Sequence, residues 1–250
     1  MSDTDPPHKK RRKLAATRAA RHAQLESNLD RMTLLAHQLK APLSVISALA
    51  QGLSRRGHHM SADEIRDRGR KIWHASRRLD ELIGTIMNYT RANAGGIVMD
   101  RTIFDIKPVL QRIVREHERL SGLRRCELDI AALPDRISGD AVLIEQALGV
   151  VLANALRYSA ENSRVIVTGH SCERSITITI RDSGIGISSH DLPFVSQPFF
   201  RGTNTRRLPG TGLGLSLARH IVSLHNGGLQ IESEEGAGTT VRIELPWQGD

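Results

Sequence analysis

The sequence LLAHQLKAPL at residues 34–43 decides how the first part of this chain folds. Around it, apolar residues recur at alternating steps of three and four: Leu25, Leu29, Met32, Ala36, Leu39, Leu43, Ile46, Ala50 and Leu53. This spacing is typical of the seam of a coiled coil or a helical bundle. His37 lies one residue past a seam position, so we expect its imidazole beside the packed stripe, within reach of another domain.

A second helix is predicted to follow the first after a break at Gly57. Residues 61–64, Ser-Ala-Asp-Glu, form a capping box, a sequence that starts helices. The seam of this helix repeats at heptad spacing through Ile65, Ile72, Leu79 and Ile86. Two antiparallel helices cannot bury their apolar stripe alone, so the pattern predicts a homodimer with a four-helix bundle.

His37 has two interpretations at this point. A single histidine on an amphipathic helix is most often an ordinary surface residue. Pro42, however, lies inside the same apolar pattern, where it removes an amide donor and costs about 3 kcal/mol unless the helix bends. Such a defect one turn after an exposed imidazole favours a functional site.

Composition limits the class of protein. The 250 residues are 39% hydrophobic but only 3% aromatic, which predicts an aliphatic core in one large domain or two modest ones. Part of the net charge of +8 lies in the basic run HKKRRK at residues 8–13, which we interpret as a solvated tail rather than a nucleic-acid site. No apolar run approaches the roughly 18 residues of a membrane span, and no signal peptide is apparent, so a cytoplasmic protein is expected. Cys126 and Cys172 lack the spacing of a zinc site or disulfide framework.

The domain organisation follows from breaks in the pattern. We expect a disordered tail over residues 1–22, the helical hairpin over 23–93, a linker over 94–101 containing two adjacent glycines, a mixed domain over 102–247, and a short tail over 248–250. In the mixed domain, helices are predicted at 105–120, 140–158 and 213–225, and strands at 102–104, 125–130, 164–170, 174–181, 229–234 and 239–245. This order predicts an α+β sandwich with helices on one face of a mixed sheet.

Several short motifs in the mixed domain suit a nucleotide. Asn154 lies in an otherwise apolar helix, where its amide oxygen is a suitable ligand for Mg²⁺, although a buried Asn bonded to backbone is equally plausible. Arg157 follows on the same face and is placed to contact phosphate. The run DSGIGI at residues 182–187 offers a carboxylate at a strand end and two glycines that allow close approach of a ring; alone, it is also an ordinary turn.

Two further glycine-rich runs complete the set. GTGLGL at residues 210–215 ends a loop and begins a helix, so its amides and the helix N-terminus suit a polyphosphate; it is not a Walker A motif. GAGTT at residues 236–240 turns into the last strand and brings hydroxyls near the base, or is a plain hairpin turn. Between them, PFFRG at residues 198–202 supplies apolar anchors for a lid, or simply packs under a long loop.

Taken in order, these motifs and the segment around His37 resemble the histidine, N, G1, F, G2 and terminal glycine boxes of sensor histidine kinases, over roughly residues 25–247. The resemblance implies a Bergerat-type ATP-binding domain, similar to that of gyrase, Hsp90 and MutL, with ATP and Mg²⁺ as ligands. It implies catalytic roles for His37, Gln38 and Arg157, and a metal ligand in Asn154. The residues that it implies for ATP binding are Asn154, Tyr158, Asp182, Gly184, Gly186, Ile187, Phe200, Arg201, Gly210, Thr211, Gly212, Leu213, Gly214 and Thr240.

The resemblance further implies autophosphorylation of His37, followed by transfer to an aspartate of a response regulator, with a separate sensor protein as a further possible partner. Three positions depart from the family pattern. Gln38 orients an imidazole but cannot take its proton, Ala41 replaces the polar residue of relatives that dephosphorylate their regulator, and Val150 replaces a polar residue one turn before Asn154. The alternatives are a degenerate kinase acting as a dimeric scaffold and an ATPase of the gyrase or Hsp90 type.

Overall fold

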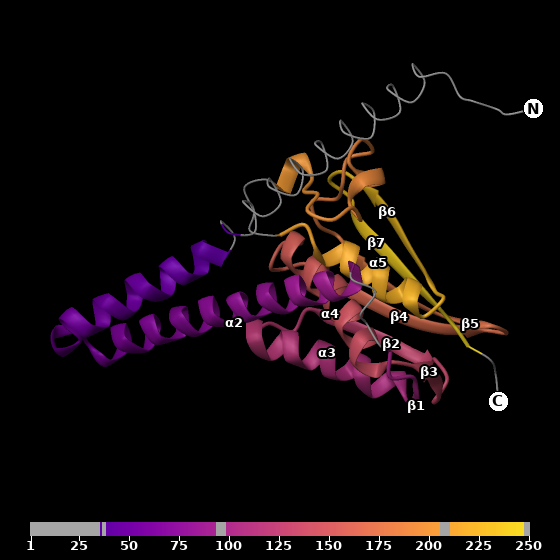
Figure 1. Ribbon diagram of the computed structural model, residues 1–250, viewed down its shortest axis with the longest axis horizontal. Coiled ribbons are helices and arrows are strands. Elements are labelled where there is room, and N and C mark those ends of the chain that lie inside the picture. The colour runs from indigo at the N-terminus through magenta and orange to yellow at the C-terminus, as the bar shows by residue number, and fades with distance from the viewer. Residues whose placement is uncertain (1–35, 37–38, 94–98, 206–210, 248–250) are drawn as a thin grey trace, which may run out of the picture. The chain divides into compact units, whose positions relative to one another are not determined.

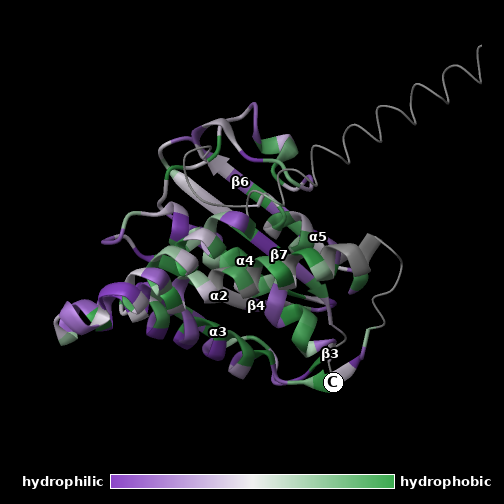
Figure 2. Cartoon of the chain, turned by 60° about the vertical axis from the view of Figure 1, so that its left-hand side comes forward, coloured by the Kyte–Doolittle hydropathy of each residue, from purple (hydrophilic) through white to green (hydrophobic). Residues whose placement is uncertain are grey.

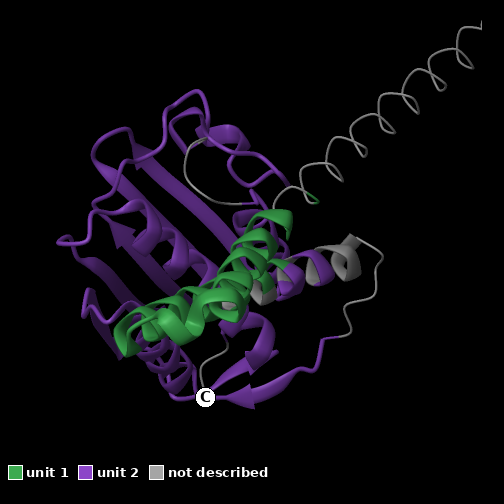
Figure 3. Ribbon diagram, turned by 90° about the vertical axis from the view of Figure 1, so that its left-hand side faces the viewer, with its two compact units in different colours: residues 1–82 green, residues 83–250 purple. Residues whose placement is uncertain are grey.

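The computed structural model describes residues 36, 39–93, 99–205 and 211–247 (Figure 1). Its chain divides into two compact units, residues 1–82 and 83–250, which Figure 3 distinguishes by colour. Three residues with predicted roles, His37, Gln38 and Gly210, lie outside the described residues.

The described part of the first unit belongs to a helical hairpin, whose second helix continues into the second unit. Residues 39–56 form a helix that continues through Pro42, and the turn η1 (Gly57–His59) leads to α2 (Ala62–Asn93). The predicted capping box is confirmed, because the Ser61 N–H donates to the Glu64 carboxylate at 2.8 Å and the Glu64 N–H donates to Ser61 Oγ at 3.2 Å. Gly52 lies against the Arg68 guanidinium, and Figure 1 shows the two helices side by side and antiparallel.

The second unit is built on a five-stranded mixed sheet. The strand order is β2-β4-β5-β7-β6, with β2 and β4 parallel and the other neighbours antiparallel. The strands are β2 (Cys126–Ala132), β4 (Val165–Cys172), β5 (Ser175–Asp182), β6 (Gly228–Glu234) and β7 (Gly238–Pro246). Along β5 the apolar residues Ile176, Ile178 and Ile180 are buried while their neighbours are partly exposed, so one face of the sheet forms the core.

Three helices cover that face: α3 (Ile106–Ser121), α4 (Ala141–Tyr158) and α5 (Gly214–Leu224) (Figures 1 and 2). Asp105 and Asp140 cap the first two by accepting backbone N–H bonds of the first turn. The predicted α+β sandwich is therefore confirmed. A small second sheet, which the sequence did not predict in full, pairs β1 (Thr102–Phe104) antiparallel with β3 (Ile137–Gly139).

Helix α4 alone, among the described residues, is long and apolar enough to cross a membrane by length and composition. Its buried side chains belong to the core cluster of the second unit, between α3, α5 and the sheet: Ile144, Ala147, Leu148, Val151, Leu152 and Ala155. We therefore assign α4 as the central core helix of this unit, which Figure 2 shows as largely apolar.

Candidate functional site

A buried carboxylate marks the end of the central strand β5. Asp182 is 8% exposed, and its Oδ1 accepts the Gly184 N–H at 2.8 Å. It lies opposite Thr239 of β7. Burial raises the pKa of Asp182, against the opposing effect of hydrogen bonds from the Gly184 and Thr239 backbone and from the Ser159 side chain. The Asp182 carboxylate is therefore a desolvated hydrogen-bond acceptor at the C-terminal end of the central strand.

The turn after Asp182 is fixed from two sides. The Ile185 N–H donates to the Tyr158 carbonyl at the end of α4 (3.1 Å), and the Ile185 carbonyl accepts the Gly236 N–H from the β6–β7 turn (2.9 Å). The next residue, Gly186, has φ 62°, and a Cβ there would lie 1.9 Å from the Glu234 carbonyl oxygen. Only glycine fits this position, so the backbone forms one rigid wall of the site.

Arg125, the residue directly before β2, fixes the turn that follows α4. Its guanidinium donates to the carbonyls of Leu156 (3.2 Å), Ala160 (2.6 Å) and Ser163, the last through Nε at 3.0 Å. These bonds satisfy carbonyls at the helix C-terminus, where a cation is also favoured by the helix dipole. The turn that carries Tyr158 and Ser159 is thereby fixed beside Asp182.

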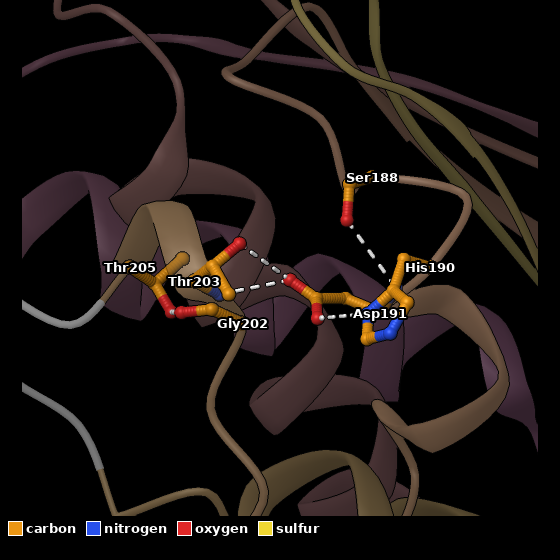
Figure 4. Close-up of polar contacts among 6 residues, drawn as sticks. All are labelled: Ser188, His190, Asp191, Gly202, Thr203 and Thr205. Atoms are coloured by element: carbon orange, nitrogen blue, oxygen red, sulfur yellow. Dashed lines mark hydrogen bonds and ion pairs between the residues drawn. The ribbon is translucent and has the colours of Figure 1, made fainter.

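A second carboxylate closes the loop between the sheet and α5. Asp191 is buried and accepts both the N–H and the hydroxyl of Thr203, at 2.8 and 2.9 Å, with His190 Nδ1 3.4 Å away (Figure 4). The Thr203 bonds hold the pKa of Asp191 below its usual range. The next residue, Asn204, donates its side-chain amide to the Gly186 carbonyl at 3.1 Å. Asp191 therefore holds Thr203 in place, and Asn204 beside it ties the loop to the wall formed by Gly186.

The apolar residues of this loop pack on one another. The rings of Phe194, in η2 (Leu192–Phe194), and Phe200 have centroids 5.7 Å apart. The Phe199 N–H donates to the Gly212 carbonyl at 2.9 Å, just before α5 begins. The loop is thus fixed at Phe199 on one side and in η3 (Thr203–Thr205) on the other. Both readings of the PFFRG segment, lid anchor and loop packing, are compatible with these contacts.

The start of α5 lies against the middle of α4. A Cβ on Gly214 would be 2.8 Å from Val150 Cγ1 and 3.7 Å from Asn154 Nδ2, so the glycine allows the two helices to approach closely. Asn154 is half-buried, and its amide nitrogen Nδ2 lies toward the first turn of α5. Helix N-termini present unpaired N–H groups and partial positive charge. This corner combines a side-chain amide with an anion-binding helix end, and the use of the Asn154 oxygen as a metal ligand stays a prediction.

The structure brings most of the predicted residues to one edge of the unit: Asn154, Tyr158, Asp182, Gly184, Gly186, Ile187, Thr211, Gly212, Leu213 and Gly214. Phe200 and Arg201 lie in the adjoining loop. Arg157 is exposed, and its contact with phosphate stays a prediction.

One placement requires a correction. Thr239, rather than Thr240, lies opposite Asp182, while Thr240 pairs with Arg181, whose side chain is exposed. Successive side chains of a strand point to opposite faces, so a shift of one residue reverses the role. Thr239 supports Asp182 through its backbone N–H, while its hydroxyl lies 2.8 Å from Ser233 Oγ.

Sequence reasoning missed three residues: Ser159, Asp191 and Asn204. A signal existed for Ser159, a small polar residue directly after the predicted nucleotide helix. Asp191 and Asn204 act on partners 12 and 18 positions away in the chain, and no local pattern reveals such contacts.

Four features of the site together point to one class of ligand. Asp182 is an acceptor suited to an exocyclic amine, the glycine turn leaves room for a flat ring, and the start of α5 suits anionic groups. Asn154 adds a side-chain amide, whose oxygen is of the type that binds Mg²⁺, at the anionic end. A purine nucleoside polyphosphate satisfies all four features.

Comparisons with known proteins agree with this reading. Residues 139–249 match the family described as histidine kinase-, DNA gyrase B- and HSP90-like ATPase, and residues 28–95 match the His Kinase A phospho-acceptor domain. The sensor-like histidine kinase SenX3 of Mycolicibacterium smegmatis is 28% identical over 229 residues, covering 90% of this chain and 59% of the relative. The histidine protein kinase DivJ of Caulobacter vibrioides is 29% identical over 248 residues, covering 94% and 42%.

Solved structures give the same picture. The fold is similar to that of the Acinetobacter baumannii histidine kinase AdeS, with a TM-score of 0.62 and 20% identity over 85% of this chain and 98% of that one. It is also similar to the mycobacterial sensor histidine kinase MprB, with a TM-score of 0.53 and 28% identity over 60% of this chain and all of that one. The chain spans 42–59% of the length of the two curated relatives named above. With a phospho-acceptor domain followed by this ATPase-type domain, the chain belongs to the sensor histidine kinases of two-component systems.

Proposed function

We propose that this chain transfers the γ-phosphoryl group of ATP to His37 and then to an aspartate of a response regulator. The observation that carries the proposal is the pairing of two parts in one chain: the phospho-acceptor match at residues 28–95, which contains His37, and the nucleotide-type site around Asp182. An ATPase of the gyrase type needs only the second part. The pairing therefore favours a kinase over an ATPase.

The chemistry is an in-line displacement. A neutral imidazole nitrogen of His37 attacks the γ-phosphorus, a P–N bond forms, and the bond to the bridging oxygen breaks as ADP leaves. Such transfers depend mainly on positioning and on neutralising charge. Asp182 and the Gly186 turn hold the base, the amides at the start of α5 bind phosphate oxygens, and Arg157 adds positive charge. Gln38 orients the imidazole without accepting its proton.

Mg²⁺ is part of this proposal. Among the described residues, no group of three His, Cys, Asp or Glu side chains is arranged to hold a metal on its own. Asn154 nevertheless offers one hard oxygen at the phosphate end, which fits an ion that keeps several waters and binds mainly through phosphates. When bound there, Mg²⁺ neutralises negative charge on the phosphates.

The hairpin supports a proposed homodimer. Leu43 is 52% exposed, Ile65 42% and Trp73 45% within a single chain. Large apolar side chains exposed on a helical hairpin are typical of a surface that another chain covers, so a second copy is the expected partner. A receiver domain of a response regulator is the proposed phosphate acceptor, and a separate sensor protein is a further proposed partner.

Autophosphorylation is tested with ATP labelled at the γ-phosphate. We expect protein-bound label that is labile in acid and stable in alkali, that disappears in His37→Gln and that persists in the matched control His58→Gln in η1. Phosphate release unaffected by His37→Gln would show an ATPase instead. ATP binding without either reaction would show a scaffold, and both results would overturn the proposal.

A further inference from the structure

A buried histidine ends helix α5, far along the helix from its nucleotide end. His225 is 4% exposed, and both ring nitrogens have backbone partners. Nδ1 lies 2.8 Å from the Ile221 carbonyl oxygen, and Nε2 accepts the Asp140 N–H at 2.9 Å. A carbonyl only accepts and a backbone N–H only donates, so the two contacts together require a neutral ring with its proton on Nδ1.

Asp140, the partner of His225, makes two other kinds of contact. Its Oδ1 accepts the Val142 and Leu143 N–H groups, both at 3.1 Å, and caps α4. Its Oδ2 accepts the Asp100 N–H at 3.1 Å. Asp140 is itself 8% exposed, so these bonds are largely shielded from water. One residue thus connects the start of α4, the end of α5 and the segment at residue 100.

The segment at residues 99–104 precedes α3 within the second unit, and it contacts the same corner at further points. The Arg101 guanidinium reaches the Leu224 carbonyl of α5 at 3.4 Å. Strand β1 then pairs with β3 so that Thr102 lies opposite Gly139, the residue before Asp140. The incoming chain is therefore attached to the end of α5 both directly and through Asp140.

Helices α4 and α5 run antiparallel and are held at both ends. At the nucleotide end, Gly214 packs against Val150 and Asn154. At the other end, the Asp140 N–H bonds to His225. A helix behaves as a rigid element over this length, so a shift at its C-terminus displaces its N-terminus as well. A change in the contact between Asp140 and His225 is therefore expected to shift the amides at the start of α5.

We propose that Asp140 and His225 are positioning residues, a buried latch through which the incoming segment at residues 99–101 sets the place of α5 and so the affinity for the phosphates of ATP. The latch rests on the proposed function in one respect, that the start of α5 binds phosphate. Asp182 lies on the sheet instead, so the latch acts on the phosphates and not on the base.

Two substitutions at position 225 distinguish the hydrogen bond to Ile221 from the hydrogen bond to Asp140. His225→Asn keeps a short side-chain amide near Ile221 but does not reach the Asp140 N–H. His225→Gln extends an oxygen toward that N–H and restores its acceptor. The variants are both neutral and polar, so a loss seen in Asn and rescued in Gln depends on the bond to Asp140.

Asp140→Asn tests the other side of the latch. The Asn oxygen caps α4 as well as an Asp oxygen does. Its NH₂ group replaces Oδ2 and so faces the Asp100 N–H, which loses its acceptor. The helix cap and the bond to His225 are kept, and only the incoming segment is released. His220→Gln, on the same helix, is the matched control for a histidine substitution in α5.

The measurement is the affinity of the full chain for Mg-ATP and for adenosine by calorimetry, with thermal unfolding as a check of folding. We expect His225→Asn and Asp140→Asn to reduce the ratio of ATP to adenosine affinity by about fivefold or more. Adenosine affinity itself, His225→Gln and His220→Gln should stay within about twofold of the unmodified chain.

Parallel loss of ATP and adenosine affinity would indicate a general loss of structure and would overturn the latch. An unchanged ratio in both His225→Asn and Asp140→Asn would overturn it too, while leaving the kinase proposal intact. If the unmodified chain binds adenosine but gains nothing from the phosphates, the proposed role of α5 fails, and the premise of the latch with it.

Discussion

At the scale of single residues, Asp182 is the most informative side chain, because its charge is buried before any ligand arrives. Asp182→Asn should abolish tight ATP binding, since an NH₂ group replaces an acceptor at the base. The same change should raise the melting temperature of the unliganded chain, because it removes a desolvated charge. Calorimetry and thermal unfolding measure the two effects, and a less stable variant would contradict the second.

The pH dependence of this effect has a definite sign. The pKa of Asp182 is raised in the folded chain, so the folded state holds its proton at pH values where the unfolded state has lost it. The contribution of this group to stability is therefore present at low pH and is lost as pH rises above the ordinary carboxyl pKa of about 3.9. The gap in melting temperature between Asp182→Asn and the unmodified chain should widen over that rise.

Sequence reasoning at this scale succeeded where chemistry and local position coincide. Asp182 lies at the end of an alternating strand, and Asn154 interrupts an apolar helix; both stand out without a structure. Thr239 and Thr240 show the limit, because they are chemically identical neighbours and only the pairing of β7 with β5 decides which one faces Asp182.

At the scale of elements, the loop between β5 and α5 depends on the bonds of Asp191 to Thr203. Asp191→Ala should lower the melting temperature by a few degrees and expose residues 188–205 to limited proteolysis. Thr203→Val should have a smaller effect, because it removes only the hydroxyl bond. The N–H of residue 203 still donates to Asp191 in this variant. Equal protease resistance in all three proteins would contradict this role.

The sign at Asp191 is opposite to that at Asp182. Hydrogen bonds from Thr203 lower the pKa of Asp191 in the folded chain. Its contribution to stability is therefore present above the ordinary carboxyl pKa and is lost as pH falls through the lowered value. The difference between the unmodified chain and Asp191→Ala should shrink in acid.

Element boundaries were predictable where capping residues mark them. Asp105 and Asp140 precede their helices by one residue, and Ser61 with Glu64 marks the start of α2. Strand β3 was not predictable, because three residues carry no readable alternation and its partner strand β1 lies more than 30 positions earlier, as with Thr102 opposite Gly139. The pairing exists only because the core brings the two segments together.

At the scale of the whole molecule, self-association should depend on the hairpin. Leu43→Glu places a charge on its exposed apolar surface and should shift the chain from dimer to monomer in sedimentation experiments at micromolar concentration. Val142→Glu is the matched control, because Val142 is 74% exposed on α4 and lies outside the hairpin. Dissociation caused equally by both substitutions would contradict a dimer interface on the hairpin.

The core of the second unit has a consequence for how such chains diversify. Every residue of the described core cluster and of the apolar residues packed against it lies between Phe104 and Trp247. The parts that shape the nucleotide site are therefore encoded in one continuous segment, which recombination can move as a block. Exchange of the preceding hairpin for another should change which protein is addressed while leaving the chemistry of the bound nucleotide intact.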